Sequence, residues 1–147
     1  MPAFTMELKG ADALLKKLLE LETKTAKKVM QKGLRAGAKI TLDATKARAP
    51  VLSGRLKRSL VARASMPGRK KKRGTLQMLV YPSTKKEPKL VTEKDGARWY
   101  YPSVVEFGSS KRPANPFMRR AFDATKQQAS EAIIRVANQA LMEEARK

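Results

Sequence analysis

The chain has 147 residues, of which 41% are hydrophobic and 5% aromatic, so it is long enough for one domain with a mainly aliphatic core. It contains 33 Lys and Arg against 13 Asp and Glu, and the net charge of +20 at pH 7 exceeds what solubility requires and predicts a polyanion nearby. The absence of His and Cys excludes a Ser-His-Asp triad, a Cys-His pair, disulfides and His- or Cys-ligated zinc, which argues against an enzyme and against a bound cofactor.

The N-terminal segment predicts a short strand and then a helix. Residues 4–9, FTMELK, alternate apolar and polar side chains as a half-buried strand does. Asp12 is suited to cap a helix whose apolar face would be formed by Leu14, Leu15, Leu18 and Leu19. The segment lacks a basic region followed by a continuous apolar run, and the chain contains no apolar run of membrane-spanning length, so we expect neither a secretory signal nor a membrane span.

Residues 23–49 continue the helical pattern that begins at Asp12, because small and apolar residues recur at steps of mostly three and four; we expect one long amphipathic helix with room for a kink near residues 21–23. Gly33 and Gly37 lie one turn apart on its apolar stripe, where a neighbouring element could pack closely. Pro50 disfavours the helical conformation at Ala49 and so ends the helix there.

The middle of the chain predicts strands separated by basic loops. Leu56 and residues 60–64 resemble one strand, after a turn at Ser53-Gly54, and TLQMLVYP (residues 75–82) resembles another, so the two would form a hairpin with a charged tip. We expect basic loops at about residues 66–74 and 83–97, the second of them mobile or ordered only on a partner.

Asn115-Pro116 predicts the start of a second long helix that runs to about Ala145, with Asn115 as the cap and Pro116 in the first helical position. Its expected buried residues follow steps of three and four: Met118, Ala121, Phe122, Thr125, Ala129, Ala132, Ile133, Val136, Ala140 and Leu141. At about 45 Å the helix is longer than its own core requires, so we expect its end to project or to pack against another subunit. The fold class is therefore α+β: one domain, residues 1–147, with an antiparallel sheet of about three to five strands packed with a long N-terminal and a long C-terminal helix.

Positive charge concentrates in the predicted loops. Residues 50–98 hold 14 basic and 3 acidic residues, and no recognition helix or stacking aromatics accompany the two loops, so any nucleic-acid contact there would be to phosphates. Solvated loop tips are an equally good interpretation, and a localisation signal is a weaker one. The candidate contacts to DNA or to an acidic partner are Arg69, Lys70, Lys71, Lys72, Arg73, Lys85, Lys86 and Lys89.

Residues 100–122, which we call the elbow, combine aromatics, three prolines and a lone acid, Glu106. One carboxylate without a partner acid or His is poor evidence of catalysis; to stay ionised beside Phe107 it needs a cation or several N–H donors, and we expect an ion pair with Arg98, Arg119 or Arg120. Trp99 and the other aromatics nearby would lie in the core or at a subunit interface. The candidate elbow and interface residues are Tyr101, Val105, Glu106, Phe107, Gly108, Pro113, Asn115, Pro116 and Phe117.

Three segments in this order resemble one protein family: APVLSGRLKRSL (residues 49–60), YPSVVEFGSS (101–110) and RPANPFMRRAF (112–122). The family is that of the neck or tail-completion proteins of long-tailed, lambda-like bacteriophages, also described as minor tail components or head-tail joining proteins. Ser109 stands where the family more often has Thr, Pro102 follows Tyr101 where a small residue is usual, and the basic insert between the strands is additional.

The resemblance implies a non-enzymatic structural protein of the virion that assembles in the host cytoplasm and completes or joins the tail at the head-tail junction. It implies other neck and tail proteins as partners, a homo-oligomeric ring that could be a hexamer, and no membrane. The loops at 66–74 and 83–97 would then face DNA in the channel or acidic surfaces of neighbouring rings. Two alternatives stay open: a free-standing, sequence-independent nucleic-acid-binding protein and a tail terminator ring.

Overall fold

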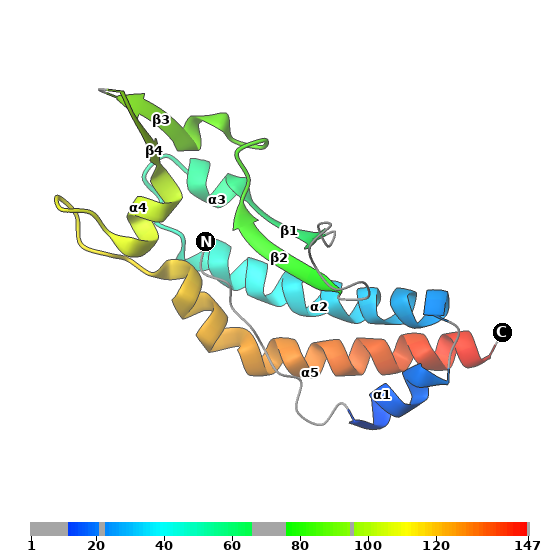
Figure 1. The fold of residues 1–147 in the computed structure, drawn as a ribbon. Helices are drawn as coiled ribbons and strands as arrows, with labels where there is room; N and C mark the ends of the chain where they lie inside the picture. The colour runs from blue at the N-terminus through cyan, green and yellow to red at the C-terminus, as the bar shows by residue number, and fades with distance from the viewer. Residues whose placement is uncertain (1–11, 21–22, 66–75, 95, 147) are drawn as a thin grey trace.

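Two long helices form the base of the structure, a computed structural model that describes residues 12–20, 23–65, 76–94 and 96–146. Helix α2 (Thr23–Arg48) and helix α5 (Phe117–Ala145) lie side by side and run in opposite directions (Figure 1). The end of α2 and both ends of α5 lie within one or two residues of where the periodicity and the flanking prolines predict them. The helix that we expect to continue from Asp12 is instead two helices, because residues Asp12–Leu19 form a separate element, α1. The α+β class is confirmed, with the four described strands placed at one side of this helix pair.

Two glycines of α2 allow the helix pair to pack closely. A Cβ atom at Gly33 would lie 2.7 Å from the carbonyl oxygen of Ile133, and one at Gly37 would lie 2.6 Å from Cγ1 of the same residue. Ala129 and Ala137 of α5 are also buried at this contact. Close packing of another element on the glycine stripe is therefore confirmed, and that element is α5.

The carboxyl-terminal end of α5 is covered by helix α1 (Asp12–Leu19). Leu14 and Leu18 of α1 are buried together with Val29 of α2 and with Ala137 and Leu141 of α5. The end of α5 therefore does not project alone, because α1 folds back to supply an apolar partner. Packing of this end against another subunit stays a prediction. Eight of the ten residues predicted to be buried on α5 are buried: Met118, Ala121, Thr125, Ala129, Ala132, Ile133, Ala140 and Leu141. Phe122 and Val136 are partly exposed, and Phe117 and Ala137 are buried although the prediction did not include them.

The first predicted hairpin is present. Strand β1 (Leu60–Ser65) pairs antiparallel with β2 (Gln77–Pro82), with Leu60 opposite Pro82, and both strands pack against α2. Leu56 is not in this strand but in a short helix, α3 (Arg55–Ser59), that follows Gly54 in its left-handed conformation at φ 68°. The strand predicted at residues 4–9 and the basic loop at 66–74 lie outside the described residues.

The second predicted loop is a folded hairpin, so the expectation of a mobile segment at 83–97 is wrong. A turn of 3-10 helix, η1 (Pro88–Leu90), leads into β3 (Val91–Lys94), which pairs antiparallel with β4 (Ala97–Tyr100). Leu90 is fully buried and anchors the hairpin, and Gly96 takes the left-handed conformation at the tip. The described strands thus form two separate two-stranded sheets, where we had expected one sheet.

A tyrosine connects the two hairpins. The Tyr100 hydroxyl at the end of β4 donates a hydrogen bond of 2.9 Å to the carbonyl oxygen of Pro82 at the end of β2. Burial, together with the smaller effect of the neighbouring Tyr81, raises the pKa of Tyr100 above its ordinary value. The folded protein therefore favours the neutral phenol that this bond requires.

Tyr100→Phe should lower the free energy of unfolding by about 1 kcal/mol at neutral pH, because it removes one net hydrogen bond. Since the pKa of Tyr100 is higher in the folded than in the unfolded protein, its contribution is complete below about pH 10 and is lost as the pH rises further. Urea unfolding at pH 8 and pH 11 should show a smaller alkaline loss in the variant. Equal losses in the two proteins would contradict this assignment.

Candidate functional site

The shape of the elbow depends on a glycine with a positive φ angle and on the chain reversal that follows it. Helix α4 (Tyr101–Phe107) ends at Gly108, which has φ 77° and whose N–H donates to the carbonyl oxygen of Val104 at 2.9 Å. A Cβ at Gly108 would lie 2.8 Å from the backbone nitrogen of Ala114, so both conformation and space require glycine there. The chain then turns at residues 109–112 and returns, and the N–H of Asn115 donates to the carbonyl oxygen of Val105 at 2.8 Å.

This return places the carboxylate of Glu106 at the amino-terminal end of α5. Its two oxygens accept hydrogen bonds of 3.0 Å from the backbone N–H groups of Met118 and of Arg119, which have no acceptor within the helix. Glu106 is 4% exposed. The negative charge also lies at the positive end of the helix dipole, so a residue of α4 caps α5 and fixes the angle between the two helices.

Two sequence expectations about this end of α5 are wrong. Glu106 has N–H donors as its partners where we expected an Arg cation, and Arg119 binds it through the backbone. Asn115 is exposed and contributes no side-chain cap; Pro116 stands before the helix, which begins at Phe117. The buried carboxylate takes the place that the Asn115 side chain would have filled.

The apolar residues of the elbow join the helices to the first hairpin. Phe117 is 1% exposed and packs in a cluster with Leu56, Leu60 and Ala49, which come from α3, β1 and the end of α2. Two other elbow residues, Tyr101 and Val105, pack against this cluster from partly buried positions, and Pro116 is also partly buried. Pro113 is exposed, so it does not fix the elbow by burial.

An open apolar cleft of about 280 Å³ lies beside the elbow. It is lined by the segment after α2, by α4 and by the returning chain: Pro50, Val51, Leu52, Tyr101, Val104, Val105, Arg112, Pro113 and Asn115. Val51 and Leu52 are 72% and 83% exposed, and Phe107 and Trp99 are about half exposed. The expectation that Trp99 and Phe107 lie in the core is therefore wrong for the isolated chain, and large apolar side chains remain available to a partner here.

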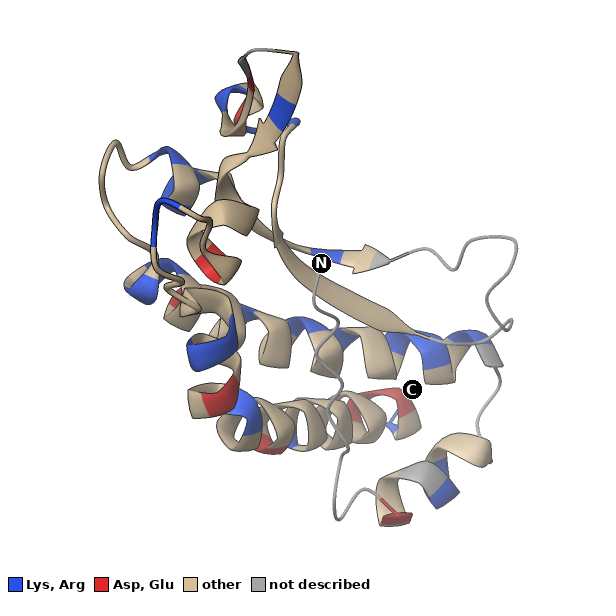
Figure 2. Ribbon diagram, turned by 60° about the vertical axis from the view of Figure 1, so that its left-hand side comes forward, with Lys and Arg blue, Asp and Glu red and all other residues tan. Residues whose placement is uncertain are grey.

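The predicted basic contacts are only partly described. Lys85, Lys86 and Lys89 are exposed, in the turn and the 3-10 helix that precede the second hairpin. The cluster at Arg69, Lys70, Lys71, Lys72 and Arg73 lies outside the described residues. The sequence analysis missed a further basic surface on α2, because its Lys and Arg residues are spread along the helix and do not form one run in the sequence. Figure 2 shows these residues in blue along the length of α2.

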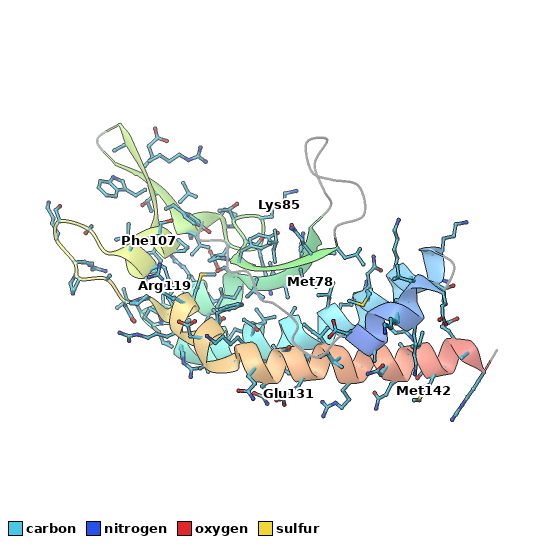
Figure 3. All side chains as sticks on the ribbon, turned by 60° about the horizontal axis from the view of Figure 1, so that its bottom comes forward. Met78, Lys85, Phe107, Arg119, Glu131 and Met142 are labelled. Atoms are coloured by element: carbon cyan, nitrogen blue, oxygen red, sulfur yellow. The ribbon has the colours of Figure 1, made fainter. Side chains whose placement is uncertain are left out.

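The described residues contain no group of three His, Cys, Asp or Glu side chains placed to hold a metal ion. Within the same part of the chain, no helix is both long enough and apolar enough to cross a membrane. Glu106, the buried acid of the elbow, has both oxygens engaged by backbone donors (Figure 3 shows the neighbouring Phe107 and Arg119).

Comparison with known proteins gives one family. The family model described as "Bacteriophage HK97-gp10, putative tail-component" matches residues 12–108, from the start of α1 to the glycine that ends α4. No curated protein and no solved structure matches. Because the match covers about two thirds of the sequence, including α2, both hairpins and α4, the chain belongs to the HK97-gp10-like family of phage tail components.

Proposed function

We propose that this protein is a non-enzymatic structural subunit of a tailed phage that acts at the head-tail junction, where it joins or completes the tail. The observation that carries the proposal is the elbow, in which a buried carboxylate fixes one helix to another next to an exposed apolar cleft. A site of this kind holds α4, α5 and the cleft beside them in a fixed arrangement, which suits a structural role. Family membership supports the placement in the virion, after assembly in the host cytoplasm.

The cleft beside the elbow is proposed as the contact between copies of this chain in a ring, which could be a hexamer. Val51 and Leu52 are large and apolar, adjacent and mostly exposed, and they line an apolar cleft, a combination that supports a contact surface here. The rigid elbow fixes the direction in which the cleft faces. A contact repeated between copies at a constant angle closes a ring when the rotations add up to a full turn.

Replacing Val51 and Leu52 together by Ser should abolish self-association and leave the stability of the monomer unchanged within about 0.5 kcal/mol, because both side chains are mostly exposed. Native mass spectrometry and urea unfolding measure the two quantities. Leu19→Ser is the matched control, since Leu19 is 85% exposed but lies on α1, away from the cleft. Oligomers of equal size in both variants would contradict the proposed interface.

Deletion of the gene from its phage tests the biological role. Filled heads and finished tails lying unattached in the lysate would support joining, and normal infectious virions would refute it. Tails of irregular length would instead favour the terminator alternative, because a terminator stops polymerisation of the tube.

The basic loop is tested separately, by complementing the deletion with a gene in which Arg69, Lys70, Lys71, Lys72 and Arg73 are replaced by Gln. Normal assembly and DNA ejection in this variant would show that these five residues are not needed for contact with DNA.

The second candidate function is a free-standing, sequence-independent nucleic-acid-binding protein, which the net charge of +20 favours. Such a protein should bind duplex DNA with micromolar affinity near physiological salt and with a steep salt dependence. It would not form rings, and its removal would leave heads and tails joined. The deletion experiment therefore separates the two functions.

A further inference from the structure

The solvent-facing side of α2 carries a continuous row of cations. Helix α2 contains eight basic residues and one acidic residue, whereas α5 contains four of each. Six of the eight follow one another at steps of three, four or seven residues and so lie on one face, which we call the α2 stripe: Lys24, Lys28, Lys32, Arg35, Lys39 and Lys46. The first five are exposed and Lys46 is partly exposed.

The packing of α2 explains why this face stays in solvent. Gly33 and Gly37 face α5, and the first hairpin packs along another side of the helix. Successive residues of the stripe fall on the side that remains, over a length of about 33 Å from Lys24 to Lys46. Within the described part of the chain, Lys32 is the one member with a carboxylate within 4.0 Å, that of Glu143 at 3.1 Å, and both of these side chains are at least half exposed.

We infer that the α2 stripe is a binding surface for the phosphate backbone of duplex DNA. One turn of B-DNA is about 34 Å long, close to the length of the stripe, and each of its strands presents a phosphate about every 3.4 Å along the axis. A straight row of like charges, spaced about 5–6 Å apart from Lys24 to Lys39 and about 10 Å from Lys39 to Lys46, suits a linear polyanion. The stripe contains five lysines and one arginine, which contact phosphates without reading base edges, so binding is independent of sequence.

Two other anionic partners fit the stripe less well. An acidic protein partner would bring an interface whose centre is apolar and aromatic and poor in Lys, and the stripe has the opposite composition. A membrane-surface helix inserts an apolar face among lipids, whereas the apolar face of α2 is already buried against α5. Protein–DNA interfaces, by contrast, are polar and strongly positive.

The stripe lies on a different element from Lys85, Lys86 and Lys89, which stand in the turn and the 3-10 helix before the second hairpin. The stripe itself is on a helix fixed by its packing along α5, so its cations are preorganised. The inference does not depend on the head-tail role, because it concerns binding by the purified protein.

The test measures binding of a fluorescent duplex of about 20 base pairs by anisotropy between 50 and 200 mM salt, roughly the range over which phosphate contacts change affinity most. The stripe variant is Lys28→Gln, Arg35→Gln and Lys39→Gln, since Gln keeps helix propensity. The matched control is Arg120→Gln, Lys126→Gln and Arg135→Gln, three exposed cations of the other long helix. Both variants lose three charges, so an effect of net charge alone would be equal in the two.

We expect the stripe variant to lose at least tenfold in affinity at about 0.1 M salt and to reduce the log–log salt slope by about three, whereas the control should change the slope by less than about one. Equal losses in both variants, or no binding by the unaltered protein, would overturn the inference. So would a stripe variant that loses binding to polyglutamate but retains duplex binding, because this would assign the stripe to an acidic protein. Circular dichroism checks that both variants keep their helices.

Discussion

Gly33→Ala is expected to destabilise the protein by about 1–3 kcal/mol, although alanine is the better helix former by about 1 kcal/mol. The added Cβ would lie 2.7 Å from the carbonyl oxygen of Ile133, which belongs to the backbone of α5 and cannot rotate away. The two long helices must therefore move apart along their main contact. Urea unfolding measures the loss. Ala124→Gly, at an exposed position inside α5, gives the cost of the reverse change in helix propensity without a packing conflict.

Gly37→Ala allows the packing conflict with α5 to be tested by a second substitution. A Cβ there would meet Cγ1 and Cδ1 of Ile133 at 2.6 and 2.8 Å, so that conflict is mainly with a side chain. Truncation of Ile133 to Ala should therefore rescue part of the cost of Gly37→Ala and little of the cost of Gly33→Ala. Strictly additive costs in both double variants would show that the glycines do not limit the approach of α5.

Glu106→Ala should cost about 2–4 kcal/mol in the free energy of unfolding. It removes two charge-assisted hydrogen bonds of 3.0 Å and leaves the N–H groups of Met118 and Arg119 without their acceptor at a buried helix end. Glu106→Gln should cost less, because one acceptor oxygen remains. Hydrogen exchange at the amides of Met118 and Arg119 should accelerate more than exchange in the middle of α5.

Glu131 supplies the matched control for this substitution. It is an exposed carboxylate on α5 whose described partner is Gln127 at 3.3 Å, so Glu131→Ala should change stability by no more than about 0.5 kcal/mol. If Glu106→Ala were as mild as Glu131→Ala, the carboxylate would not be what holds the elbow. The proposed constant angle between α4 and α5 would then lose its support.

The long helices could be predicted from the sequence because their signals are local. Apolar steps of three and four run through both segments, and Pro50 and Pro116 mark a helix end and a helix start. The helix at α3 had a local signal too: Leu56 and Leu60 are four residues apart, which suits a helix turn better than a strand. For the second hairpin, the Asp95-Gly96 dipeptide between two apolar-containing runs is a typical turn signal that the charged composition of 83–97 obscured.

The cap of α5 could not be predicted in the same way. Asn115 and Pro116 are good local signals for a helix start, and they place the start within one residue. The group that satisfies the helix, however, lies 12 and 13 residues before its donors, and it arrives only because Gly108 and the turn at 109–112 reverse the chain. A contact that forms because the chain reverses direction produces no repeating pattern of residues from which it could be predicted. For the same reason, the folding of α1 over the end of α5 was missed.

The unequal charge of the two long helices has a consequence before any contact is made. Helix α2 carries eight basic residues and one acidic residue whereas α5 carries four of each, so the helix pair is charged asymmetrically, with its positive side on α2. In the field of a polyanion this asymmetry favours orientations of the protein in which α2 faces the polyanion, already during the approach. This orienting effect fades beyond a Debye length, about 8 Å at physiological ionic strength, and association should therefore slow as salt is added even where the final complex survives.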